Sequence, residues 1–216
     1  KMPYVGGLYY LLLIGKVPSE EQALEVEKEW KARSQVPDYV FKVLKSLPGD
    51  SHPMMLFSTA ILALHHGSVF AHRYQEGMQR DEYWEAMLED SLNLTAKLPS
   101  IAAYIYNMKY KDGNYIQPQA DLDWGANFAY MMGNPSQEYM DLSRLYFIIH
   151  SDHESGNASA HATHLAASTL SDIYYALSAG LNSLAGPLHG LDNQEALRWL
   201  MGIHRKFNGV PTKDQL

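Results

Sequence analysis

The sequence has 216 residues, of which 46% are hydrophobic and 19% are charged. This length and composition are sufficient for one domain with a substantial core. Seventeen basic and twenty-four acidic side chains give a formal net charge of -7, and the arginines are scattered, so we expect no nucleic acid partner. The absence of cysteine excludes a disulfide framework, a thiolate metal site and a cysteine nucleophile.

The first residues are strongly apolar. The longest apolar stretch, residues 5–15, is shorter than the ~20 residues that a membrane-spanning helix needs, and no targeting signal precedes it, so we expect no membrane partner. The dense apolar run from Leu8 to Ile14 has no polar lead-in. We therefore expect the sequence to be part of a longer molecule.

Helix signals follow one another along the chain, and we find no convincing strand pattern. Ser19 and Gln22 have the spacing of a capping box and start a helix that ends near residue 35. Pro99 is expected to separate two helices. A shorter helix is predicted from Asp38, and further helices over 53–66, 81–97, 100–110, 124–132, 135–150, 158–170, 172–185 and 191–206. The sequence therefore predicts an all-α protein with residues 1–216 in one domain.

Small side chains are concentrated in the predicted helices 158–170 and 172–185, where alanine and glycine recur. Small residues allow two helix backbones to approach closely. We therefore expect these helices to lie in the interior or at a subunit interface.

Histidines mark the first candidate site. The segment IIHSDHESGNASAH, residues 148–161, places His150 at the end of an apolar helix and His153 in a polar turn that Gly156 closes. Histidine is the side chain that most readily gives and takes protons near neutral pH. Such a polar turn against a buried helix end is more specialised than a solvent loop requires.

A second histidine segment is SLAGPLHGLDNQE, residues 183–195. His189 lies between Gly186-Pro187 and Gly190, where one helix must end and another begin. The positive end of a helix dipole favours the neutral imidazole. A neutral imidazole can still donate a hydrogen bond to a developing enolate oxygen, as carbon–carbon bond formation next to a thioester requires.

Other readings of the histidines remain open. His161 and His164 share a helix face and, with His150 and His153, could belong to a metallohydrolase, although no HExxH pattern accompanies them. The remaining histidines have no motif and receive no role: His65, His66, His72 and His204.

Several segments resemble citrate synthases of the eukaryotic mitochondrial type, in the same order along the chain. These are GGLYYLLLIGKVPSEEQ, EGMQRDEYW, KLPSIAAYIY, LDWGANFAYMMG, SDHESGNASAH and LAGPLHGLDNQE. The resemblance implies the multi-helix large domain of that family, with the small domain mostly absent. It also implies condensation of acetyl-CoA with oxaloacetate to citrate and CoA, without a permanently bound cofactor, in the mitochondrial matrix.

The resemblance assigns roles to individual residues. His189 matches the histidine that hydrogen-bonds the thioester oxygen, and His153 matches one that binds oxaloacetate. Asn157 and Ser159 match supports of that site, and Arg80 matches a residue that contacts CoA phosphates. No metal ligand is implied.

The resemblance also implies a homodimer. The helices that resemble those of the family's dimer interface are 53–66, 81–97, 158–170 and 172–185.

The family pattern implies further groups that the sequence does not contain. These are N-terminal helices, a third histidine, additional arginines that hold oxaloacetate, and the aspartate that removes the acetyl proton. Enolisation needs a positioned base, so the fragment alone is expected to be inactive. The alternative reading is a structural or interaction subunit that kept the fold without the activity.

Overall fold

The computed structural model describes residues 2–151 and 156–215, and this part of the chain contains helices and no strand. The all-α prediction is confirmed. The α-helices are α1 (Val5–Ile14), α2 (Glu20–Arg33), α3 (Asp38–Ser46), α4 (Pro53–Leu64), α5 (Val69–Gln75), α6 (Tyr83–Tyr110), α7 (Trp124–Met131), α8 (Gln137–His150), α9 (Ala158–Ala167), α10 (Ile173–Leu184) and α11 (Asp192–Lys206). Short 3-10 turns are η1 (His65–Gly67), η2 (Arg80–Glu82) and η3 (Lys213–Gln215).

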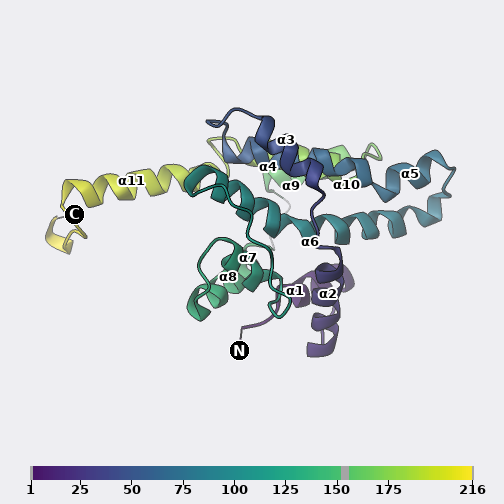
Figure 1. The fold of residues 1–216 in the computed structure, drawn as a ribbon, viewed down its shortest axis with the longest axis horizontal. Coiled ribbons are helices and arrows are strands. Elements are labelled where there is room, and N and C mark those ends of the chain that lie inside the picture. Colours follow the sequence, from purple (N-terminus) through teal and green to yellow (C-terminus); the bar gives the residue numbers. More distant parts are fainter. Residues whose placement is uncertain (1, 152–155, 216) are drawn as a thin grey trace.

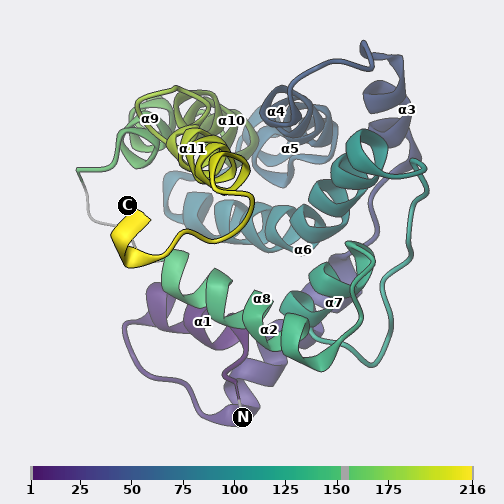
Figure 2. The same ribbon diagram turned by 90° about the vertical axis from the view of Figure 1, so that its left-hand side faces the viewer.

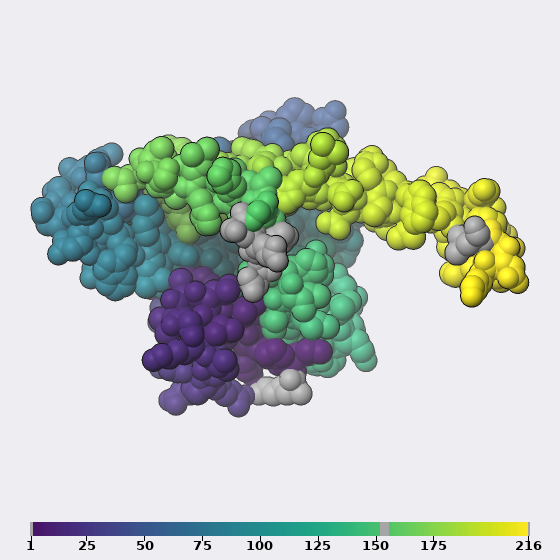
Figure 3. Space-filling model, turned by 180° about the vertical axis from the view of Figure 1, so that it is seen from behind, coloured from purple at the N-terminus to yellow at the C-terminus, as the bar shows by residue number. Residues whose placement is uncertain are grey.

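The long helix α6 runs through the middle of the molecule (Figure 1). One layer, formed by α3, α4, α5, α9 and α10, lies on one side of it, and α1, α2, α7 and α8 lie on the other (Figure 2). The helix α11 leaves this body and extends as an arm towards the C-terminal end of the chain (Figure 3). The turn that leads into α11 carries His189.

The two predicted helices 81–97 and 100–110 form one helix, so the break expected at Pro99 is wrong. Proline has no N–H to donate to the carbonyl four residues earlier, which is that of Thr95. The indole N–H of Trp124 donates to the Thr95 carbonyl oxygen at 2.9 Å. This tertiary hydrogen bond gives the carbonyl a partner, and the helix continues through the proline.

The main core lies between α6 and the layer of α3, α4 and α10. Its fully buried side chains include Val40, Leu44, Leu56, Ile61, Leu94 and Ile101. The predicted capping box of α2 is confirmed, since Ser19 accepts from the Gln22 N–H and Gln22 accepts from the Ser19 N–H.

The short helix α5 has no counterpart among the predicted helices. The Asp90 carboxylate of α6 accepts hydrogen bonds from the Val69 N–H at 2.8 Å and the Phe70 N–H at 2.9 Å. Asp90 is fully buried, and this burial raises the pKa of its carboxyl. A residue about twenty positions away in the chain therefore supplies the capping that starts α5.

The helices α9 and α10 pack closely, as the small residues predicted. A Cβ atom at Gly180 of α10 would lie 2.1 Å from the Thr163 Oγ1 atom of α9 and 3.0 Å from the Ser159 carbonyl oxygen. Only glycine permits this approach. The contact sets the position of the first turn of α9, where Asn157 and Ser159 lie.

Within residues 2–151 and 156–215, no single helix has both the length and the apolar composition to span a membrane. One bent pair, Pro53–Gly67 with Val69–Gln75, meets those two criteria jointly.

Candidate active site

Three of the predicted site residues meet where α8 ends, α9 begins and the turn between α10 and α11 passes. A cavity of about 700 Å³ lies there. Its described polar lining residues are Tyr146, His150, Ser151, Asn157, Ser159, Thr163, His189 and Asn193. Three of the predicted site residues, His189, Asn157 and Ser159, therefore share one cavity.

Asn157 is the N-cap of α9. Its Oδ1 atom accepts hydrogen bonds from the Ser159 N–H at 2.9 Å and the Ala160 N–H at 3.1 Å. The Ser159 hydroxyl also donates to it at 2.5 Å. Asparagine is among the preferred N-cap residues because it satisfies N–H groups that have no partner inside the helix. The cap fixes the positions of both Asn157 and Ser159.

The backbone of the turn holds His189 in place. The His189 N–H donates to the Gly186 carbonyl at 3.0 Å, and its own carbonyl accepts from the Asp192 N–H at 3.0 Å, where α11 begins. A Cβ atom at Gly190 would lie 2.6 Å from the Leu184 carbonyl oxygen. The glycine after His189 is therefore required for this tight return of the chain.

The His189 ring reaches across to the first turn of α9. Its Nε2 atom lies 3.0 Å from the Ser159 Oγ and 3.2 Å from the Asn157 Oδ1, and it accepts from the Ser159 N–H at 3.3 Å. His189 was expected to lie near the N-terminus of a helix. It lies near two, because its ring contacts the first turn of α9 and its backbone precedes α11.

These contacts favour one tautomer of His189. The Ser159 backbone N–H can only donate, and the Asn157 Oδ1 already accepts from three donors, so Nε2 is best placed as an acceptor. The ring proton then lies on Nδ1, which has no hydrogen-bond partner among the described residues. The arrangement leaves the Nδ1–H of His189 available to a ligand.

One predicted site residue within the described structure, Arg80, is not brought to this cavity. Arg80 lies in η2 at the start of α6, is exposed, has no ion-pair partner among the described residues and does not line the cavity. His153 lies outside the described residues.

The metal reading gains no support from the described part of the chain. No group of three or more His, Asp or Glu side chains in residues 2–151 and 156–215 is arranged to hold a metal ion. His161 and His164 are both exposed on α9.

The role of His150 in this cavity is not part of what the family resemblance implies. It lies at the end of α8 and lines the same cavity as His189. Its place in the segment 148–161, beside the other site residues, is the signal that identifies it.

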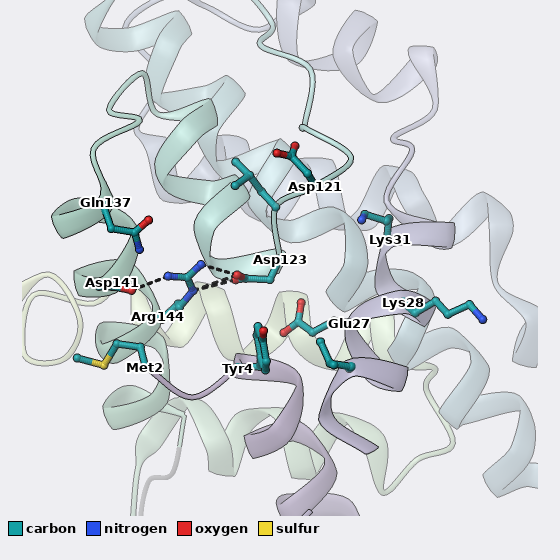
Figure 4. A pocket seen from close by; sticks show the side chains of 12 residues that line it. Met2, Tyr4, Glu27, Lys28, Lys31, Asp121, Asp123, Gln137, Asp141 and Arg144 are labelled. Atoms are coloured by element: carbon teal, nitrogen blue, oxygen red, sulfur yellow. Dashed lines mark hydrogen bonds and ion pairs between the residues drawn. The ribbon is translucent and has the colours of Figure 1, made fainter. Parts of the chain in front are cut away.

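A second cavity, of about 510 Å³, lies between α2, α8 and the segment that leads into α7 (Figure 4). Arg144 contacts Asp123 at 2.5 Å and Asp141 at 2.6 Å, and the Glu27 carboxylate forms the opposite wall. Glu27 accepts from the Gly6 N–H and the Trp124 N–H, both at 2.8 Å. These charges have partners within the protein, and none of the predicted site residues lines this cavity.

In comparisons with known proteins, residues 5–212 match the model of the family described as citrate synthase, C-terminal domain. The chain is 47% identical over 215 residues to a probable mitochondrial citrate synthase of Glossina morsitans morsitans, covering 99% of this chain and 46% of that protein. It is 48% identical over 214 residues to the mitochondrial citrate synthase of Daucus carota, covering 99% of this chain and 45% of that protein.

Among solved structures, the citrate synthase of Pyrobaculum aerophilum superposes with a TM-score of 0.81 at 31% sequence identity. The match covers 92% of this chain and 50% of that one. The chain therefore spans about half the length, or slightly less, of the relatives that it matches.

Proposed function

We propose a function from one premise: this chain belongs to the citrate synthase family. The chain contributes part of the active site that condenses acetyl-CoA with oxaloacetate. This reaction gives citryl-CoA and, after hydrolysis, citrate and CoA. The contact of the His189 Nε2 with the first turn of α9 is the observation that carries this proposal. Because the chain spans about 45% of its curated relatives, the activity belongs to the protein that contains it.

His189 is the group that stabilises the enol. When the acetyl methyl group loses a proton, negative charge develops on the thioester oxygen. The Nδ1–H of His189 is free to donate to that oxygen, because the Nε2 side of the ring is held by Ser159. One oriented donor to a developing oxyanion commonly contributes 10²- to 10³-fold in rate.

The other predicted residues support substrate binding. Asn157 and Ser159 orient the His189 ring from the capped start of α9. His153 binds oxaloacetate, and the exposed guanidinium of Arg80 contacts CoA phosphates, for which arginine is well suited. The base that removes the acetyl proton and the other oxaloacetate ligands come from parts of the family fold outside these 216 residues. The fragment alone is therefore inactive.

The remaining features of the proposal follow the family. The protein acts as a homodimer in the mitochondrial matrix, as the names of its relatives suggest for its location. Acetyl-CoA and CoA are substrate and product, and no permanently bound cofactor takes part.

The test is to express the whole protein that contains this chain and assay citrate formation from acetyl-CoA and oxaloacetate. His189→Ala is expected to lower kcat by roughly 10²- to 10³-fold, because it removes the enol donor. His72→Ala, at an exposed position on α5, is the control and should keep the activity. Absence of citrate formation by the wild-type protein with both substrates would refute the catalytic proposal and favour a non-catalytic subunit.

A further inference from the structure

His150 shares the cavity with His189 but has no part in the proposed reaction as described above. It is the last residue of α8, and it lines the cavity together with Tyr146 and Ser151. We propose that His150 is an additional substrate-binding residue that contacts a carboxylate of oxaloacetate through its Nε2. This inference rests on the proposed function of the same cavity.

Two contacts fix the His150 ring. Its Nδ1 lies 2.8 Å from the Tyr146 carbonyl oxygen, and the two rings stack with centroids 4.0 Å apart and an interplanar angle of 28°. A carbonyl oxygen only accepts hydrogen bonds, so the Nδ1 of His150 carries a proton. The ring is therefore held in one orientation before any ligand binds.

The fixed Nδ1 leaves the other nitrogen available. The two nitrogens of an imidazole diverge across the ring, so Nε2 points away from the α8 backbone. It has no hydrogen-bond partner among the described residues. A neutral ring offers an acceptor at Nε2, and a protonated ring offers a charged N–H donor to a carboxylate.

An anionic ligand would meet no carboxylate among the described lining residues of this cavity. Its described lining residues include no Asp, Glu, Lys or Arg, and the titratable groups that face it are His150, His189 and Tyr146. The histidines are therefore the only described lining groups that can become cations. Oxaloacetate is a dianion, so its binding would favour a protonated His150.

The two histidines lie at opposite ends of helices. His150 is the last residue of α8, and its Nδ1 lies at the Tyr146 carbonyl oxygen, whereas the Nε2 of His189 lies at the first turn of α9. The two rings are therefore held through different nitrogens, and each has its other nitrogen available to a ligand.

Substitution of His150 by asparagine or by glutamine distinguishes the roles of its two ring nitrogens. In His150→Asn the amide nitrogen can take the place of Nδ1, which retains the Tyr146 contact and removes Nε2. In His150→Gln the amide nitrogen can take the place of Nε2, which retains an uncharged donor there. Because His150 is exposed, both variants are expected to fold, and thermal unfolding checks this.

In steady-state assays of the expressed protein, His150→Asn is expected to raise the KM for oxaloacetate by about 10-fold or more, as for a lost hydrogen bond to a charged group. The KM for acetyl-CoA and the kcat should change by less than about 2-fold, within the context dependence of such contacts. His150→Gln should lie between His150→Asn and the wild type. His72→Asn and His72→Gln, at an exposed position on α5, are the controls. An unchanged KM for oxaloacetate in His150→Asn would overturn the inference.

A binding measurement keeps the inference separate from the proposed activity. Oxaloacetate is added to ¹⁵N-histidine-labelled wild-type protein, and the His150 Nε2 resonance is expected to shift towards that of a protonated ring. A response at His189 without one at His150 would overturn the inference and leave the proposed function standing. Failure of citrate formation with a shift at His150 would refute the proposed function and leave the binding role standing.

Discussion

The indole N–H of Trp124 donates a hydrogen bond of 2.9 Å to the carbonyl oxygen of Thr95, which is four residues before Pro99. The carbonyl that proline leaves without its helical donor is therefore satisfied by a side chain from α7. Trp124 also packs against Trp30 and Phe147, so one residue joins α2, α6 and α8.

The first prediction concerns this hydrogen bond. Trp124→Phe retains an aromatic ring but leaves the Thr95 carbonyl unsatisfied. Together with a smaller packing loss, it should lower the free energy of unfolding by about 1–3 kcal/mol. Chemical denaturation of the wild type and the variant measures this difference.

The control is to measure the effect of Trp124→Phe again in a protein that carries Pro99→Ala. Alanine restores a backbone N–H that can donate to the Thr95 carbonyl. The cost of Trp124→Phe should be smaller in Pro99→Ala than in the wild type, and the difference isolates the hydrogen-bond term. Equal costs in both backgrounds would show that Trp124 acts through packing alone.

The sequence predicted the features that depend on neighbouring residues. The capping box at Ser19 and the ends of most helices agree with the structure to within a few residues, because caps are local. The break predicted at Pro99 was wrong and α5 was not predicted, because Trp124 and Asp90 supply contacts from distant parts of the chain. Local signals contain no information about such partners.

The candidate site shows the same division. The glycines and proline around His189 identified that residue from the local pattern, whereas Asn157 was identified through the family resemblance. The contact between the His189 Nε2 and the Ser159 N–H joins residues thirty positions apart, so the tautomer could not be predicted from the sequence. The fixed ring of His150 likewise depends on the way that α8 ends at the cavity.

The second prediction concerns pH and Glu27, which is 7% exposed. Burial raises the pKa of the Glu27 carboxyl, and the charge of Asp123 acts in the same direction, whereas the N–H groups of Trp124 and Gly6 oppose the shift. The folded protein therefore binds this proton more tightly than the unfolded chain does. The resulting stabilisation is fully present below the unfolded pKa, about 4.3, and is lost as pH rises through the higher folded pKa.

The check is the free energy of unfolding of the wild type and of Glu27→Gln across this pH window. The difference between wild type and variant should shrink as pH rises, because only the wild type loses the contribution of Glu27. Glu25→Gln, at an exposed position on the same helix, should follow the wild-type curve. Parallel curves for wild type and Glu27→Gln would contradict the raised pKa.

The third prediction concerns Leu170, which follows α9 with φ of 62° and a side chain that is 47% exposed. A left-handed backbone costs a non-glycine residue roughly 1–2 kcal/mol, and glycine avoids this cost but gives the unfolded chain more freedom. Leu170→Gly should therefore raise the free energy of unfolding by about 0.5–1 kcal/mol. Leu170→Ala retains the Cβ atom and should show no gain, and a gain of equal size in alanine would rule out backbone strain as the cause.

The fourth prediction separates the two roles of Asn157, the cap of α9 and a neighbour of His189 at 3.2 Å. Asn157→Ala removes the cap and should lower the free energy of unfolding by about 0.5–2 kcal/mol. Asn157→Asp preserves the cap, so its stability should remain close to that of the wild type. Its carboxylate, however, lies beside the Nε2 of His189 and should favour a proton on that nitrogen.

The ¹⁵N spectrum of His189 reports where its protons lie. In Asn157→Asp we expect a protonated Nε2 and, with the proposed function, a lower kcat, because the ring no longer holds the neutral form with its proton on Nδ1. Asn157→Ala should leave the His189 spectrum closer to that of the wild type while losing stability. If Asn157→Asp leaves the His189 spectrum unchanged, the contacts at Nε2 do not determine the tautomer, and the assignment of Nδ1 as the enol donor loses its structural basis.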